Sequence, residues 1–174
     1  MSHKLLNPLN PDKPKRVAIV ISNPAVSTTT GAPVGFWWAE LTHPYFHFTE
    51  AGYQVKVFSP RGGPCVADHI SDPEDTSQWQ AEDVISRGYK HDPAFAKLID
   101  NTKKVDDIDV NRFDALVVAG GQGPMFTFET AENLHRTFVE FHQSGRLTAA
   151  LCHGVAILRY ARLAIGEPLV QARP

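Results

Sequence analysis

The 174-residue sequence contains only two cysteines, and it has no CxxC motif and no clustered Cys/His set. Two cysteines in dissimilar surroundings do not build a disulfide framework, and without ligand clusters a structural zinc site is not expected. The sequence also lacks an excess of positive charge, because 17 Lys and Arg stand against 19 Asp and Glu, for a net charge of -2. This balance argues against a nucleic-acid-binding protein.

Long hydrophobic runs and an N-terminal signal are absent as well. No stretch approaches the roughly 18 apolar residues of a membrane span. The opening segment MSHKLLNPLNPDKPKR has no apolar core of the kind found in secretory signals. We therefore expect a cytoplasmic protein in a reducing setting, with no membrane partner. Hydrophobic residues make up 43% and charged residues 21% of the chain, which is the balance of a globular domain.

The prolines at 8, 11 and 14 predict an extended lead-in over 1–15, and the length predicts a single α/β domain over 16–174. Continuous apolar runs predict four strands buried on both faces: RVAIVI (16–21), QVKVFS (54–59), ALVVA (115–119) and RLTAAL (146–151). Helices are expected over 44–51, 92–100, 131–143 and 155–163. Alternation of strand and helix predicts a doubly wound parallel sheet with helices on both faces.

Cys152 lies in AALCHGVAIL, at the junction between a predicted strand and the helix that follows it. Sites in doubly wound sheets lie at the carboxyl ends of strands, and a sharp turn there exposes a nucleophile. The helix N-terminus would lower the thiol pKa, and the next backbone N–H could bind an oxyanion. His153 could orient or deprotonate a neighbouring group. A small buried cysteine explains the local pattern equally well.

Two further segments are candidates for the same site. The AGGQG turn follows a buried strand, and the backbone N–H groups of Gly120 and Gly121 could contribute to an oxyanion site. A plain tight turn is the alternative. Glu40 is an acid among large apolar residues in GFWWAEL, where burial would raise its pKa and let it exchange a proton. From the residues alone, a surface glutamate ahead of a helix is slightly favoured.

Several other features receive no catalytic role. His43 and His47 have the spacing of a metal-binding pair, but no third ligand is evident, so we expect a partly exposed helix face and no metal. Cys65 follows Gly-Gly-Pro and is predicted to be a surface-loop thiol, and Asp68 is given no role. The stretch 60–91 is predicted to be long and irregular, which is typical of functional or mobile loops.

Three ordered blocks of the sequence resemble the ThiJ/PfpI superfamily: GFWWAELTHPYFHFTEAGYQVKVFSPRGG (35–63), DALVVAGGQGPM (114–125) and GRLTAALCHGVAIL (145–158). The segments HISDPEDTSQW and FAKLIDNTKKVDDIDVNRFDAL resemble one branch, the heat-shock-protein-31-like, glutathione-independent glyoxalases (glyoxalase III). The resemblance implies the flavodoxin-like fold of class I glutamine amidotransferases, with a nucleophile elbow.

The same resemblance implies roles for individual residues. Cys152 matches the nucleophile, His153 the histidine beside it, and Glu40 the acid that contacts the cysteine. The backbone N–H groups of Gly121 and His153 match the oxyanion site. In this branch an acidic third member of a Cys-His-acid triad follows well after the cysteine. The sequence ends at Pro174, so we expect the C-terminal part of the family fold, and with it the acid that orients His153, to be missing.

The activity implied by the resemblance is conversion of methylglyoxal-type 2-oxoaldehydes to 2-hydroxy acids, such as D-lactate, through a cysteine hemithioacetal. The reaction needs no cofactor, and the resemblance implies a homodimer. One alternative is a stress-related chaperone or a cysteine redox sensor without catalysis. Another is a cysteine hydrolase or amidase, a deglycase or an isonitrile hydratase of the same superfamily.

Overall fold

The structure is a computed structural model that describes residues 15–163 and 166–169. Its strands and α-helices follow in the order β1 (Arg16–Val20), β2 (Ala25–Val26), β3 (Pro33–Val34), α1 (Trp38–Glu50), β4 (Gln54–Ser59), α2 (Val84–Lys90), α3 (Pro93–Asp100), β5 (Lys103–Lys104), β6 (Ala115–Val118), α4 (Pro124–Thr127), α5 (Glu132–Gln143), β7 (Leu147–Ala150) and α6 (Ile157–Tyr160). Short 3-10 helices lie at His69–Ser71, Val105–Asp107, Val110–Arg112 and Cys152–Ala156.

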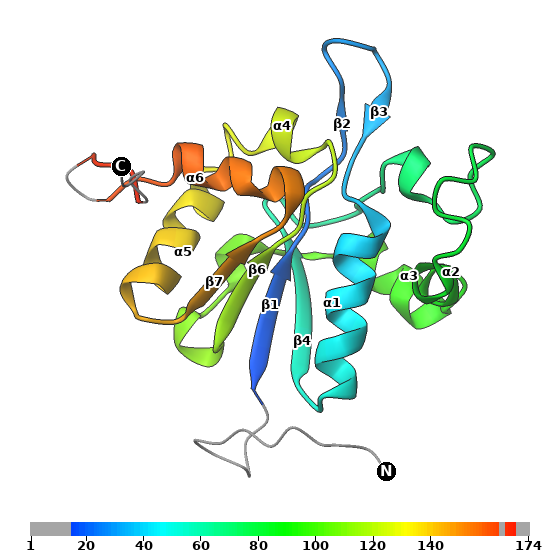
Figure 1. Cartoon of the computed structure of the whole chain (residues 1–174). Coiled ribbons are helices and arrows are strands. Elements are labelled where there is room, and N and C mark those ends of the chain that lie inside the picture. The colour runs from blue at the N-terminus through cyan, green and yellow to red at the C-terminus, as the bar shows by residue number, and fades with distance from the viewer. Residues whose placement is uncertain (1–14, 164–165, 170–174) are drawn as a thin grey trace, which may run out of the picture.

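Five strands form one sheet in the order β5-β4-β1-β6-β7, and every neighbouring pair is parallel (Figure 1). Because β1 lies between β4 and β6, the chain winds outward from it in both directions, as in flavodoxin-like folds. The four strands expected from apolar runs are all present, each within one residue of its expected ends. The predicted α/β class and parallel sheet are confirmed.

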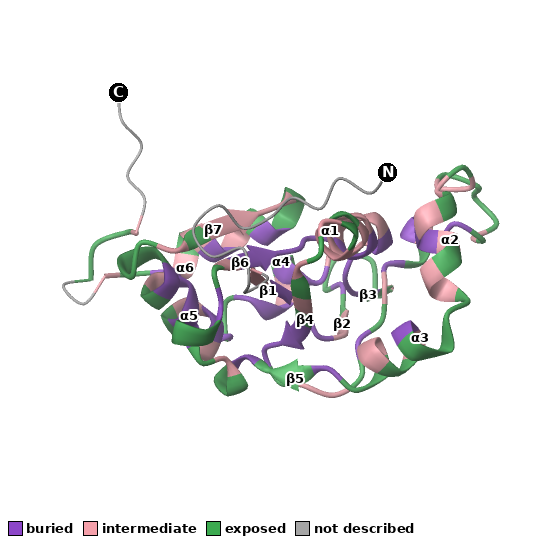
Figure 2. Ribbon diagram, turned by 90° about the horizontal axis from the view of Figure 1, so that it is seen from below, coloured by how far each residue is buried: buried purple, intermediate pink, exposed green. Residues whose placement is uncertain are grey.

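Alternate residues of the central strands face two separate cores. Val20 of β1 belongs to the cluster that includes Phe138 and Phe141 of α5. Ile19, its neighbour, belongs to the cluster that includes Leu41 of α1. Figure 2 shows α1 and α5 on opposite sides of the sheet. Since both faces are covered, the strands are continuous apolar runs rather than alternating ones.

The helix expected over 44–51 begins earlier, at Trp38, and Pro44 lies inside it rather than in its first turn. Proline has no N–H to donate within the helix, which costs stability in an interior turn. Trp38 and Leu41, both buried, hold the first turn against the core and offset this cost. The placement of Pro44 at the start of the helix is therefore wrong, and the extra turn contains Glu40.

The helix expected over 155–163 is also different. A 3-10 helix, Cys152–Ala156, comes first, and the short α6 ends at Tyr160. The tight turn is closed by the Gly154 N–H, which donates to the carbonyl of Leu151 at 2.7 Å. This bond spans three residues, so the chain after the cysteine begins with 3-10 rather than α geometry.

The stretch 60–91 is less irregular than expected, because it contains the 3-10 helix at His69–Ser71 and α2. Asp83 caps α2, since its side chain accepts a hydrogen bond from the Ser86 N–H at 3.0 Å. Polar bonds of this kind leave no apolar periodicity, which explains why the helix was not predicted.

The expected lead-in over 1–15 lies, apart from Lys15, outside the described residues. In the ranges that are described, none of the helices has the length and apolar character needed to cross a membrane.

Two leucines on neighbouring strands test the packing of the sheet. Leu116 of β6 is fully buried, whereas Leu147 of β7 is 62% exposed. We predict that Leu116→Ala lowers the free energy of unfolding by about 2–5 kcal/mol, because it leaves a cavity in a packed face. Leu147→Ala should change it by about 0.5 kcal/mol or less. Urea unfolding followed by circular dichroism measures both, and equal losses would contradict the assigned core.

Candidate active site

Cys152 lies one residue after β7, following Leu151, and begins the 3-10 helix Cys152–Ala156. Its backbone φ is +46°, in the left-handed region that residues other than glycine seldom adopt. The residue is exposed, just after the carboxyl end of β7, the edge strand that pairs in parallel with β6. A strained turn that presents the sulfur at a strand end has the geometry of a nucleophile elbow.

The cysteine lines a pocket of about 430 Å³. Its walls come from the start of α1, the turn after β6 and the turn after β7, at the carboxyl ends of the strands (Figure 1). The lining residues are Trp37, Glu40, Gln122, Met125, Phe126, Cys152 and His153. The structure therefore brings together the three side chains that were predicted from distant parts of the sequence.

Glu40 lies in the first turn of α1 and links two parts of the pocket. Its Oε2 accepts a hydrogen bond from the Gly120 N–H at 2.7 Å, and its carboxylate lines the pocket beside the Cys152 thiol, whose pKa it raises. Glu40 is thus not the surface residue that the sequence slightly favoured. The Gly120 N–H, expected to face a substrate, instead donates to Glu40, because the glycine backbone passes directly against the carboxylate.

The backbone N–H groups of Gly121 and His153 lie near the Cys152 sulfur, where they oppose the rise in the pKa of its thiol. Gly121 has a φ of +90°, and a Cβ there would lie 2.6 Å from the carbonyl oxygen of Gly35. Only glycine allows this loop to approach so closely. The two amides are placed to stabilise negative charge on the sulfur or on an oxygen bound beside it.

The pKa of the Cys152 thiol is raised above its ordinary value. Partial burial of the sulfur is the largest cause, even though the residue as a whole is exposed, and the negative charge of Glu40 is the next. The N–H groups of His153 and Gly121 act in the opposite direction. The expectation of a lowered pKa is wrong, because partial burial and the Glu40 carboxylate both raise it and only a 3-10 turn follows the cysteine.

His153 is oriented by the backbone. Its Nδ1 lies 3.0 Å from the carbonyl oxygen of Gly121. A carbonyl can only accept a hydrogen bond, so Nδ1 carries the hydrogen and Nε2 of the neutral ring is left as a proton acceptor. In the part of the chain that the structure describes, a peptide carbonyl therefore holds the ring where the resemblance implied an acidic side chain.

Asp68 is the residue that the sequence analysis missed. Its side chain is 1% exposed, and its two oxygens accept hydrogen bonds from the Gly35 N–H at 2.9 Å and the Gln122 N–H at 2.6 Å. Burial raises its pKa, while the two N–H donors and the charges of His153 and His69 oppose that rise. Asp68 ties the loop before α1 to the AGGQG turn, so it is structural to the pocket.

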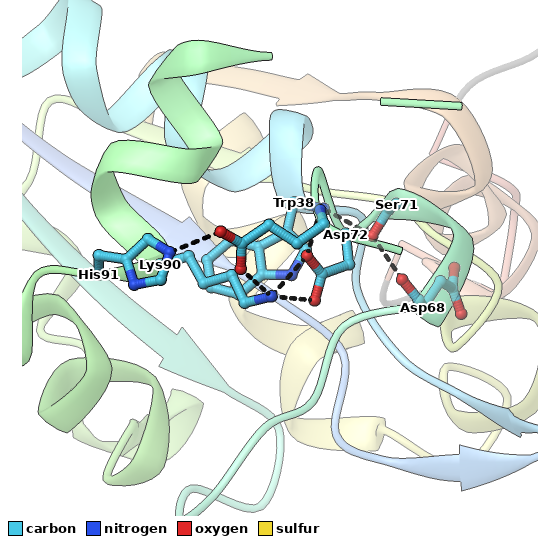
Figure 3. Close-up of polar contacts among 7 residues, drawn as sticks. Trp38, Asp68, Ser71, Asp72, Lys90 and His91 are labelled. Atoms are coloured by element: carbon cyan, nitrogen blue, oxygen red, sulfur yellow. Dashed lines mark hydrogen bonds and ion pairs between the residues drawn. The ribbon is translucent and has the colours of Figure 1, made fainter. Parts of the chain in front are cut away.

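Further polar contacts fix the loop that contains Asp68, Ser71 and Asp72 (Figure 3). The Ser71 hydroxyl donates to the Asp68 carbonyl at 2.7 Å and accepts from the Trp38 N–H at 3.1 Å. Beside it, Nζ of Lys90 lies 2.7 Å from both carboxylate oxygens of Asp72. The loop is thereby attached to the start of α1 and to the end of α2.

Cys65 is buried, with 4% of its surface exposed, and is not the surface thiol that was expected. Its sulfur lies 3.7 Å from Oγ1 of Thr102 and 3.9 Å from Nδ2 of Asn23. Burial raises the pKa of this thiol as well. The Cys65 N–H donates to the Ile99 carbonyl at 2.9 Å, so the loop packs against the segment that leads into β5, which the local Gly-Gly-Pro sequence did not reveal.

The histidine pair of α1 makes contacts that need no metal. Nε2 of His43 lies 2.9 Å from Oδ1 of Asp83, and His47 is exposed. Across 15–163 and 166–169, no three His, Cys, Asp or Glu side chains come together in a metal-binding arrangement.

The family model described as DJ-1/PfpI matches residues 34–169, a range that holds Glu40, the AGGQG turn and Cys152. The chain belongs to the DJ-1/PfpI family. This assignment confirms the resemblance to the ThiJ/PfpI superfamily.

Several relatives of this DJ-1/PfpI chain carry glyoxalase names. Glutathione-independent glyoxalase hsp3101 of Schizosaccharomyces pombe is 29% identical, over 75% of this chain and 52% of its own length. Glyoxalase 3 of Candida albicans is 26% identical, over 82% and 59%. The solved structure of Rapid Encystment Protein 24 kDa of Francisella tularensis matches with a TM-score of 0.79 and 25% identity, covering 90% of this chain and 67% of that one. The chain spans less than two thirds of these two curated relatives.

The contact between Glu40 and Cys152 predicts how the thiol titrates. Alkylation of Cys152 by iodoacetamide should rise with pH at a midpoint above that of an ordinary cysteine. Glu40→Gln should lower the midpoint, because it removes the charge that opposes the thiolate. Glu50→Gln, at an exposed position of the same helix, serves as the control and should leave it unchanged. Mass spectrometry of the Cys152 peptide gives the rates, and a midpoint insensitive to Glu40→Gln would refute the contact.

Proposed function

We propose that this DJ-1/PfpI protein converts 2-oxoaldehydes such as methylglyoxal to 2-hydroxy acids, D-lactate in that case, without glutathione. The observation that carries the proposal is the convergence of the Cys152 sulfur, the Glu40 carboxylate and the two backbone amides of Gly121 and His153 at one pocket. The glyoxalase names of the relatives support the same chemistry.

In the first step the Cys152 sulfur adds to the aldehyde carbon of the substrate. Because the thiol pKa is raised, the proton leaves as the bond forms, and the neighbouring Glu40 carboxylate accepts it. The aldehyde oxygen becomes an oxyanion beside the amides of Gly121 and His153. Returning the proton to that oxygen gives a hemithioacetal.

In the second step a proton moves between the two carbons of the bound substrate. Nε2 of His153 is the available acceptor, since Nδ1 is held by the Gly121 carbonyl. It takes the proton from the carbon that bears sulfur, leaving an enediolate, and returns it to the neighbouring carbon. The former aldehyde carbon is oxidised and the ketone carbon is reduced, so no outside oxidant is required. Water then hydrolyses the resulting thioester, which releases the 2-hydroxy acid and restores the Cys152 thiol.

The lining and the volume of the pocket support a small 2-oxoaldehyde as the substrate. Trp37, Met125 and Phe126 supply apolar lining beside the polar groups of the pocket. A pocket of about 430 Å³ is at the small end of ligand sites, which suits a short 2-oxoaldehyde. We also propose that the protein is a single domain over 16–174, works in the cytoplasm and forms a homodimer. The exposed thiol of Cys152 suits a reducing compartment.

Lactate formation tests the proposal. Purified protein mixed with methylglyoxal in the absence of glutathione should form D-lactate, measured with D-lactate dehydrogenase. Cys152→Ser should abolish product, and Glu40→Gln should lower kcat by about 10²–10⁴-fold, the usual contribution of general acid–base catalysis. Cys65→Ser makes the same change at the buried cysteine and should retain turnover if its circular dichroism spectrum is unchanged.

A redox-sensing role is the second candidate, because Cys152 is exposed beside Glu40. Absence of lactate from the folded wild type would overturn the glyoxalase proposal. A gain of about 32 Da at Cys152 after mild peroxide, in a protein without turnover, would then favour the sensor.

A further inference from the structure

Asp68 and His153 contact the two ends of one peptide group. The Gln122 N–H donates to Oδ2 of Asp68 at 2.6 Å. The carbonyl of the same peptide unit belongs to Gly121, and it accepts the hydrogen of His153 Nδ1 at 3.0 Å. A carboxylate, a peptide group and an imidazole therefore lie in series, joined by two hydrogen bonds.

We propose that Asp68 is the positioning residue for His153 and acts on it through the peptide group between Gly121 and Gln122. This inference rests on the proposed function only for its effect on turnover, because the orientation of the ring can be measured separately. The arrangement places the acid of a Cys-His-acid triad one peptide group away from its histidine.

The physical basis is polarisation of the peptide group. A hydrogen bond from an N–H to a carboxylate is about twice as strong as a neutral one, and it draws electron density toward the carbonyl oxygen. Hydrogen bonds in series strengthen one another in a low-dielectric interior, by roughly 10–30% per bond. With Asp68 ionised, the Gly121 carbonyl is a better acceptor for His153 Nδ1, and the tautomer with a free Nε2 is favoured.

The surroundings of Asp68 fit this role. Its side chain is buried, and its second oxygen is held by the Gly35 N–H at 2.9 Å, so the carboxylate cannot rotate away from Gln122. The titratable groups whose charges face it are His153 and His69, and both lower its pKa. Burial is the largest influence and leaves the pKa of Asp68 raised, while the two amide donors and the charges of the two histidines, when they are protonated, favour the ionised form.

Substitution of Asp68 by Asn provides a sharp test. The two side chains have the same shape, but asparagine has a single acceptor oxygen, so one of the two backbone N–H groups loses its partner and the charge is removed. We expect ¹⁵N NMR of the neutral His153 ring to show the Nδ1–H tautomer in the wild type. In Asp68→Asn the ring should shift toward the Nε2–H tautomer. Asp100→Asn, at an exposed position, is the matched control.

Turnover gives the second readout. Asp68→Asn should lower kcat by about 10- to 100-fold, the usual cost of removing a group that orients an active residue, with KM changed less. In a His153→Gln background Asp68→Asn should lower kcat by about twofold or less, because the imidazole that Asp68 positions is no longer present. Equal losses in both backgrounds would show that Asp68 has only a structural role, and would overturn the inference.

The ring measurement separates this inference from the proposed function. Suppose that the wild type forms no lactate, but its His153 ring is the Nδ1–H tautomer and shifts away from it in Asp68→Asn. This result would refute the glyoxalase activity and would support the positioning of His153 by Asp68. If Asp68→Asn does not fold, NMR of the wild type alone still tests the positioning role of Asp68. The Gln122 amide proton of the wild type should be strongly deshielded in the NMR spectrum. A folded wild type whose His153 ring is the Nε2–H tautomer would refute the positioning role of Asp68.

Discussion

The candidate site depends on backbone segments that lie closer together than side chains would allow. A Cβ at Gly120 would lie 2.8 Å from Oε2 of Glu40 and from the N–H nitrogen of His153, and a Cβ at Gly154 would lie 2.6 Å from the carbonyl oxygen of Val118. Separations below about 3 Å are not tolerated, so glycine is required wherever these turns meet. This close approach brings peptide N–H groups to the Cys152 sulfur, and every proposed step of catalysis uses that position.

Two carboxylates near the pocket have different surroundings and therefore different tasks. Glu40 is half-buried, contacts the thiol and can exchange a proton with it. Asp68 is fully buried and bonded to two backbone amides, so its charge acts on the position of other groups. Active sites often separate acid–base and orienting roles in this way, because environment rather than residue type sets the behaviour of a carboxyl group.

The strands and the place of the cysteine could be predicted because they leave marks in the sequence. Strands covered on both faces are continuous apolar runs, and Cys152 interrupts such a run with a histidine and a glycine. Asp68 could not be found in this way, since its partners are backbone N–H groups, which every sequence has. The pKa of Cys152 was predicted in the wrong direction, because a pattern of neighbours along the chain reveals neither the partial burial of the sulfur nor the negative charge of Glu40, which is far away in sequence.

A raised thiol pKa affects which substrates the cysteine can attack. A thiol that keeps its proton until an electrophile arrives is a poor target for oxidants and for weak alkylating agents, whose reactions need a preformed thiolate. An aldehyde differs, because its own oxygen gains a charge as the sulfur adds, and that charge forms beside two N–H donors. Proton loss to Glu40 and oxyanion stabilisation then occur in one step. In the proposed mechanism, the surroundings that disfavour a free thiolate at Cys152 thus favour carbonyl substrates over general thiol chemistry.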